Sequence, residues 1–121
     1  MADSSGRPDL IFLRDQIRDF VSERDWDQFH TPKNLATALS VEAAELLEPF
    51  QWLKTGESVE LDDQKRFAIR QEMADVLIYL IRLADKLDVD LVAAAEEKLA
   101  HNRTKYPVDK ARGNARKYSE Y

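Results

Sequence analysis

Apolar side chains recur every three or four residues along most of the chain, which is the spacing that places them on one face of an α-helix. Asp9 precedes the first such segment and can cap a helix that we expect to end near residue 23. Thr31 and Pro32 form the pattern of a helix cap followed by proline in the first turn. We expect this second helix to reach about residue 53, with a kink or an early end at Pro49, because proline removes a backbone donor and clashes with the preceding turn.

The second half of the chain predicts two more helices and a tail. One helix is expected over residues 63–87, and Asp88 or Asp90 can cap another that runs to about residue 104. Pro107 blocks its continuation. No segment shows the alternation of a β-strand. The sequence therefore predicts an all-α protein, a four-helix bundle over residues 9–106, with a disordered N-terminus at 1–8 and a basic C-terminal tail at 107–121.

Size and composition narrow the class of protein. A chain of 121 residues fits one domain with a modest core, so assembly with further copies would add stability. The net charge of −5 argues against a polymeric nucleic acid as partner, and the absence of cysteine excludes disulfides and thiolate metal sites. The first residues lack the apolar stretch of a secretory signal, and no run approaches the ~20 apolar residues of a membrane span. We therefore expect a cytoplasmic protein with no membrane partner.

Two pairs of carboxylates carry the candidate chemistry. Glu42 and Glu45 lie in the second predicted helix, and Glu72 and Asp75 lie in the third. Residues three apart are neighbours on one helix face, so each pair points in one direction. Glu42 and Glu72 fall on or beside the apolar stripes of their helices, whereas Glu45 has the fewest apolar neighbours. Two helices joined by a short loop are expected to pack antiparallel, which would make the pairs face each other.

Such a cluster needs compensation, because burying an unpaired charge costs on the order of several kcal/mol. Basic partners, protonation or a metal ion can supply it. Oxygen ligands in this number suit Mg²⁺ or Mn²⁺, and the lack of a well-placed histidine argues against zinc. Two alternatives stay open at this point. The same spacing is common on solvated helix faces, and a non-catalytic helical oligomerisation module would pair its acidic groups with arginines.

Several stretches together resemble one family. The pattern E-x-x-E, a spacer and E-x-x-D is that of the MazG-like nucleotide pyrophosphohydrolases, and the closest likeness is to their dCTP pyrophosphatase branch. The resemblance covers roughly residues 10–121 and rests on the stretches 23–30, 32–35, 50–52, 72–80, 102–107 and 116–118. Val41 stands where the broader family has another glutamate, which the dCTP branch also lacks. Ile17 stands where vertebrate members of that branch have a base-pocket histidine.

The resemblance implies a role for each candidate residue. Glu42, Glu45, Glu72 and Asp75 would be the catalytic residues and would hold Mg²⁺. The substrate-binding residues would be Trp26, His30 and Trp52 around the nucleobase, Tyr79 near the sugar or the metal ligands, and Lys98 and Asn102 at the phosphates. Family members assemble as dimers or tetramers whose active sites use more than one subunit, and we favour a homotetramer over a dimer.

Each of these residues also has a structural interpretation. The tryptophans can be ordinary core or interface aromatics, His30 a hydrogen-bonding residue, and Lys98 and Asn102 part of a solvated face. With these alternatives open, the expected activity is Mg²⁺-dependent conversion of a nucleoside triphosphate to the monophosphate and pyrophosphate. The substrate is expected to be dCTP or modified dCTP, with dUTP or other non-standard nucleotides as the alternative.

Overall fold

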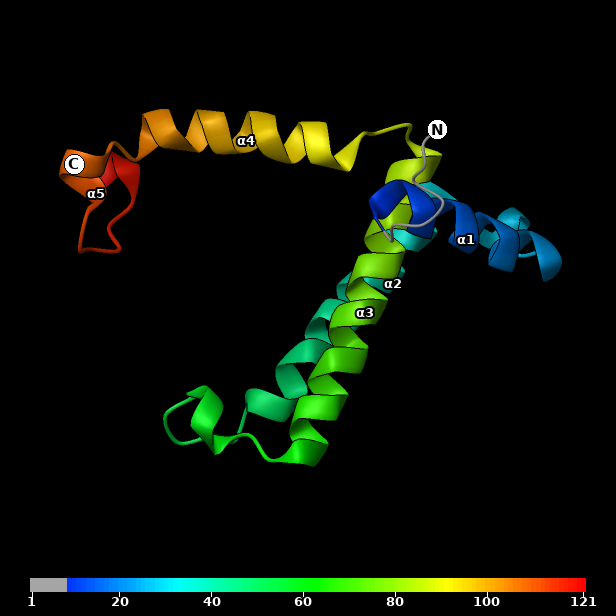
Figure 1. The fold of residues 1–121 in the computed structure, drawn as a ribbon, viewed down its shortest axis with the longest axis horizontal. Coiled ribbons are helices and arrows are strands. Elements are labelled where there is room, and N and C mark those ends of the chain that lie inside the picture. The colour runs from blue at the N-terminus through cyan, green and yellow to red at the C-terminus, as the bar shows by residue number, and fades with distance from the viewer. Residues whose placement is uncertain (1–8) are drawn as a thin grey trace. The chain divides into compact units, whose positions relative to one another are not determined.

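The structure is a computed structural model that describes residues 9–121, and within that range it contains α-helices and no strand. The helices are α1 (Leu10–Glu23), α2 (Pro32–Leu47), α3 (Asp63–Lys86), α4 (Leu91–Lys105) and the short α5 (Val108–Ala111) (Figure 1). Single 3₁₀ turns occur at Asp27–Phe29, Glu48–Phe50, Ser58–Glu60 and Tyr118–Glu120. The all-α prediction is confirmed. The predicted disorder of residues 1–8 lies outside the described residues.

Short polar side chains set where the four long helices begin. The carboxylate of Asp9 accepts a hydrogen bond from the backbone N–H of Phe12 at 2.9 Å. The hydroxyl of Thr31 caps α2, and the carboxylates of Asp62 and Asp90 cap α3 and α4. Each cap satisfies a backbone donor that the first turn leaves free, and such a bond typically contributes about 1 kcal/mol. Of the two candidate caps for α4, the chain uses Asp90.

The second helix ends earlier than its expected limit near residue 53. It stops at Leu47, and a 3₁₀ turn over Glu48–Phe50 follows. Pro49 lies in that turn, where it cannot donate to a continuing α-helical ladder. Of the two outcomes expected at Pro49, an early end is the one observed.

The described residues divide into two compact units after Asp88. In the first unit α2 and α3 run antiparallel, side by side, and α1 packs against α3 (Figure 1). Its small core is formed by Val21, Leu35, Ile81 and Ala84. The loop between α2 and α3 is held by one carboxylate, because Glu60 accepts backbone hydrogen bonds from residues 54, 55 and 56. This loop lets the two long helices fold back on each other.

The second unit begins at Val89 and contains α4, α5 and the C-terminal turn. Two tyrosines of the predicted tail, Tyr118 and Tyr121, contact the ring of Tyr106 edge-on, each with centroids 6.0 Å apart. The ammonium group of Lys105 lies 4.7 Å from the centroid of Tyr118. These aromatic and cation–π contacts fold the tail against the end of α4. In neither unit is a described helix long and apolar enough to cross a membrane.

Leu35 of α2 is the largest fully buried side chain of the described residues, with only 1% of its surface exposed. We expect Leu35→Ala to lower the free energy of unfolding by about 2–5 kcal/mol, since it removes buried methyl groups and leaves a cavity. Urea denaturation followed by circular dichroism measures this change. Val59→Ala is the control, because that side chain is 84% exposed. Equal effects of the two substitutions would contradict the placement of the core.

Candidate metal centre

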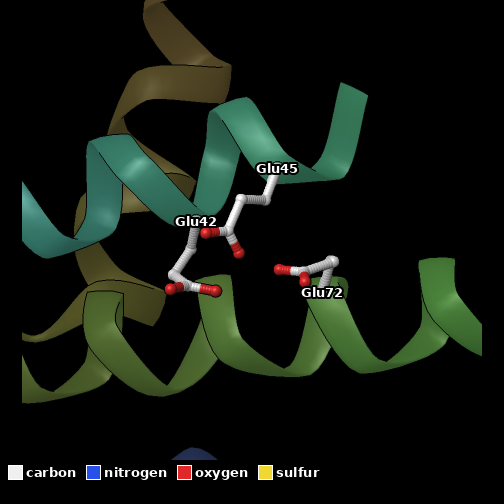
Figure 2. Close-up of side chains that lie close together, drawn as sticks. All are labelled: Glu42, Glu45 and Glu72. Atoms are coloured by element: carbon white, nitrogen blue, oxygen red, sulfur yellow. The ribbon is translucent and has the colours of Figure 1, made fainter. Parts of the chain in front are cut away.

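Three glutamates converge between α2 and α3. Glu42 and Glu45 come from α2 and Glu72 comes from α3, and each offers a carboxylate oxygen within 4.8 Å of the others. Figure 2 shows the three side chains pointing toward one another across the space between the two helices. All three are half-buried. The predicted convergence of acidic groups from two neighbouring helices is therefore present in the fold.

Local structure explains this arrangement. Glu42 and Glu45 are three residues apart in an uninterrupted helix, so both point to the face that α2 presents to α3. The antiparallel course of α3 brings Glu72 opposite them. Pro49 lies one turn after Glu45, just beyond the end of α2, and the loop that follows lets the chain reverse direction into α3. The site thus depends on the packing of two helices and not on a loop.

The surroundings of Glu42 disturb its ionisation. Burial, a hydrogen bond with Glu72 and the negative charges of Glu45, Glu72 and Asp75 together raise the pKa of the Glu42 carboxyl to about 7. With both groups ionised, Glu72 Oε2 is buried and has no hydrogen-bond partner among residues 9–121. A proton on Glu42 relieves this, because the protonated carboxyl can donate to Glu72. When all three carboxyl groups are ionised, the buried oxygen of Glu72 therefore lacks a hydrogen-bond or ionic partner within residues 9–121.

No cation of the protein supplies that partner within residues 9–121, where every ion pair involves other carboxylates. The alternative in which arginines neutralise these acidic groups therefore does not describe this site. A cluster of carboxylate oxygens with one buried oxygen unsatisfied has the donor chemistry that a hard divalent cation requires. Glu42, Glu45 and Glu72 are the residues that would hold such an ion.

Asp75 stands slightly apart from the other three. Its side chain is exposed, and its oxygens are outside the group that lies within 4.8 Å. It is still close enough for its charge to raise the pKa of Glu42. Tyr79, one turn farther along α3, is half-buried. The predicted fourth ligand is therefore adjacent to the cluster and is not one of its converging members.

The aromatic candidates are distributed over the two ends of α2. Trp26 and His30 precede the helix, and Trp52 follows it, so the 16 residues of α2 separate them by about 24 Å. Trp26 packs edge-on against Phe20 with centroids 5.6 Å apart, and Trp52 is 87% exposed. A single chain therefore does not bring the two tryptophans to one nucleobase. Lys98 and Asn102 lie on α4 in the second unit, Lys98 exposed and Asn102 half-buried.

One polar residue near the core was not anticipated from the sequence. Arg82 of α3 is only 6% exposed, and its Nε donates a hydrogen bond to His30 Nδ1 at 3.1 Å. Its guanidinium also pairs with Asp27 and Asp85. The sequence feature that could have identified it is a charged residue between Ile81 and Ala84, both of which are buried. A charged side chain that is buried where helices pack requires a polar or charged partner.

Fold and site together define a class: all-α proteins in which two antiparallel helices bring acidic side chains together between them. The sequence profile of the MazG-like family matches residues 37–121. The chain is 44% identical to human dCTP pyrophosphatase 1 over 118 residues, which is 96% of this chain and 69% of that protein, and 43% identical to the rat protein of the same name. A pyrophosphatase from Archaeoglobus fulgidus superimposes with a TM-score of 0.74 at 43% identity, over 78% of this chain and 89% of that one. The chain belongs to the MazG-like family.

The raised pKa of Glu42 predicts a pH-dependent stability in the metal-free protein. A carboxyl with a folded pKa of about 7 and an ordinary value of 4.5 contributes stability that is full below about pH 4.5. That contribution is lost as the pH rises through 7. We expect Glu42→Gln, measured by urea unfolding with a chelator present, to become more stable relative to the wild type between pH 4.5 and 7. Glu48→Gln, an exposed position one turn beyond Glu45, should keep the wild-type slope. Parallel curves for wild type and Glu42→Gln would contradict the assignment.

Proposed function

We propose that this protein is a Mg²⁺-dependent nucleoside triphosphate pyrophosphohydrolase that releases a nucleoside monophosphate and pyrophosphate. The observation that carries the proposal is the convergence of Glu42, Glu45 and Glu72 around a buried oxygen that has no hydrogen-bond partner in the described part of the chain. The names of the relatives agree with it, since both the human protein and the archaeal one are pyrophosphatases. An oxygen-only donor set favours Mg²⁺, with Mn²⁺ as the closest substitute.

The proposed reaction is in-line attack of water on the α-phosphorus. The carboxylates of Glu42, Glu45 and Glu72 would hold the cation, with the neighbouring Asp75 as the proposed fourth ligand. When bound, the cation polarises the phosphate, lowers the pKa of the attacking water and neutralises charge on the departing pyrophosphate. One glutamate of the cluster must take the proton of the water. Glu42, Glu45 and Glu72 are the alternatives for that role.

For the substrate we propose dCTP or a modified dCTP. The support is the identity to proteins named for dCTP over nearly the whole of this chain. Trp26, His30, Trp52 and Tyr79 would contact the nucleoside, and Lys98 and Asn102 the phosphates. Aromatic stacking contributes ~1–3 kcal/mol per base with little base discrimination, so related nucleotides such as dUTP remain competing substrates. The proposed cellular role is removal of unwanted nucleotides from the cytoplasmic pool.

We further propose that the active protein is a homo-oligomer, with a tetramer favoured over a dimer. The first unit buries few side chains and leaves large apolar ones exposed on α1 and α3, including Ile11, Phe67, Met73 and Ile78. Exposed apolar surface of this extent is typical of an interface. The separation of Trp26 from Trp52 along α2 adds a second argument, because a nucleobase held by both would need residues from more than one copy.

Loss of one carboxylate tests the proposed active site. We expect Glu45→Gln to reduce pyrophosphate release from dCTP and Mg²⁺ by at least about 100-fold while the helical circular dichroism signal is unchanged, since a neutral amide weakens cation binding. Asp75→Asn should also abolish turnover. Glu48→Gln is the matched control and should retain wild-type activity. Near-normal turnover by Glu45→Gln would show that the cluster is not the catalytic centre.

Metal binding has a readout that needs no substrate. At a hundredfold excess of Mg²⁺ over its dissociation constant, the wild type should gain about 2.7 kcal/mol in unfolding free energy, provided that the unfolded chain does not bind the ion. Glu72→Gln should lose most of this gain. Thermal unfolding with and without Mg²⁺ measures it. A protein that shows no stabilisation would fit a non-catalytic helical module instead.

Substrate preference needs a separate experiment. A panel of deoxynucleoside triphosphates with pyrophosphate detection ranks the substrates.

A further inference from the structure

A second polar cluster lies at the other end of the helix pair from the carboxylates. His30 stands just before α2, and Arg82 lies ten residues after Glu72 on α3, about 15 Å along the helix axis. Arg82 Nε donates to His30 Nδ1 at 3.1 Å. The 3₁₀ turn Asp27–Phe29 joins His30 to Trp26, whose side chain is 43% exposed. An imidazole and an accessible aromatic ring therefore occur together at this end.

The hydrogen bond from Arg82 determines where His30 carries its proton. A guanidinium has donors only and stays charged in proteins, so it cannot accept a proton from the ring. His30 Nδ1 must then be the acceptor, and the single proton of the neutral imidazole must be on Nε2. Burial and the charge of Arg82 both lower the pKa of His30, which keeps the ring neutral at physiological pH. Within residues 9–121 no hydrogen bond to Nε2 is found, and this atom is not buried.

Arg82 is itself fixed on several sides. Its guanidinium pairs with Asp27, which also accepts from Lys86 Nζ at 2.7 Å, and with Asp85. Asp85 in turn accepts from Arg18 Nε of α1 at 2.8 Å. The hydrogen bonds from Lys86 and from Arg18 hold the pKa of Asp27 and of Asp85 below the usual range, so both carboxylates stay charged. The network therefore sets the orientation of Arg82 before any ligand binds.

We propose that Arg82 is a positioning residue that makes His30 an obligate hydrogen-bond donor, through Nε2, to an acceptor atom on the base of the nucleotide substrate. This inference rests on the proposed function. Cytosine presents O2 and N3 as acceptors, whereas the N3 position of uracil carries a proton. A fixed donor rejects a facing donor, because the two groups repel and both lose water. Arg82 and His30 belong to the same chain. The tautomer of His30 is therefore the same whether the phosphates bind at the carboxylates of that copy or of another copy.

Nitrogen-detected NMR of the histidine rings tests the tautomer directly. In the wild type, His30 Nε2 should resonate as a protonated nitrogen and Nδ1 as an unprotonated one, and addition of dCTP with Mg²⁺ should shift Nε2. Arg82→Met, which has similar length but no donor, should give a mixture of tautomers, and Arg82→Lys should restore the Nε2–H form. A proton on Nδ1 in the wild type, or no response of Nε2 to dCTP, would overturn the inference even if Arg82→Met does not fold.

Steady-state kinetics separates positioning from a merely structural role. His30→Ala should raise KM for dCTP by about 3- to 10-fold with kcat little changed, the effect of one lost hydrogen bond. Arg82→Met should raise KM by a similar factor, and should add nothing in the His30→Ala background, because both act through one contact. A full additional loss in that background would overturn the inference. Pyrophosphate release by the wild type is the separate test of the proposed function, since the NMR readout does not depend on turnover.

Discussion

Mutual repulsion among Glu42, Glu45 and Glu72 is the constraint that the α2–α3 pair has to accommodate. Three carboxylates whose oxygens lie within 4.8 Å of one another, partly removed from water, repel one another, and this repulsion contributes to the raised pKa of Glu42. The protein leaves this charge uncompensated by its own cations in the described residues, while it pairs Asp27 and Asp85 elsewhere with arginine and lysine. The contrast indicates that compensation at the cluster comes from outside the chain.

The first unit keeps the helices that carry these carboxylates together although it buries few side chains. Leu35, Ile81 and Ala84 lie toward one end of the helix pair, together with the Arg82 network, and the carboxylates lie toward the other. Many apolar side chains of α3 have no cover within the unit. A helix pair with so small a core gains stability from contacts with further copies. Oligomerisation would thus stabilise the same helices that present the carboxylates.

Much of the fold and part of the candidate site could be predicted from the sequence, because both depend on patterns formed by residues close together in the chain. The capping residues Asp9, Thr31 and Asp90 mark where helices begin. The three-residue spacing of Glu42 and Glu45 places both side chains on the same face of one helix. Tertiary features could not be read in this way. Asp75 keeps the same spacing from Glu72 as Glu45 does from Glu42, yet it is exposed. The bond between Arg82 and His30 joins residues 52 positions apart, and no local pattern encodes it.

Paramagnetic mapping with Mn²⁺ locates a bound cation without using activity. Low Mn²⁺ should selectively broaden the backbone resonances around Glu42, Glu45 and Glu72, excess Mg²⁺ should reverse the effect, and Glu72→Gln should weaken it. Broadening spread evenly over the acidic surface, or centred on Asp27 and Asp85, would contradict a cation site at this cluster.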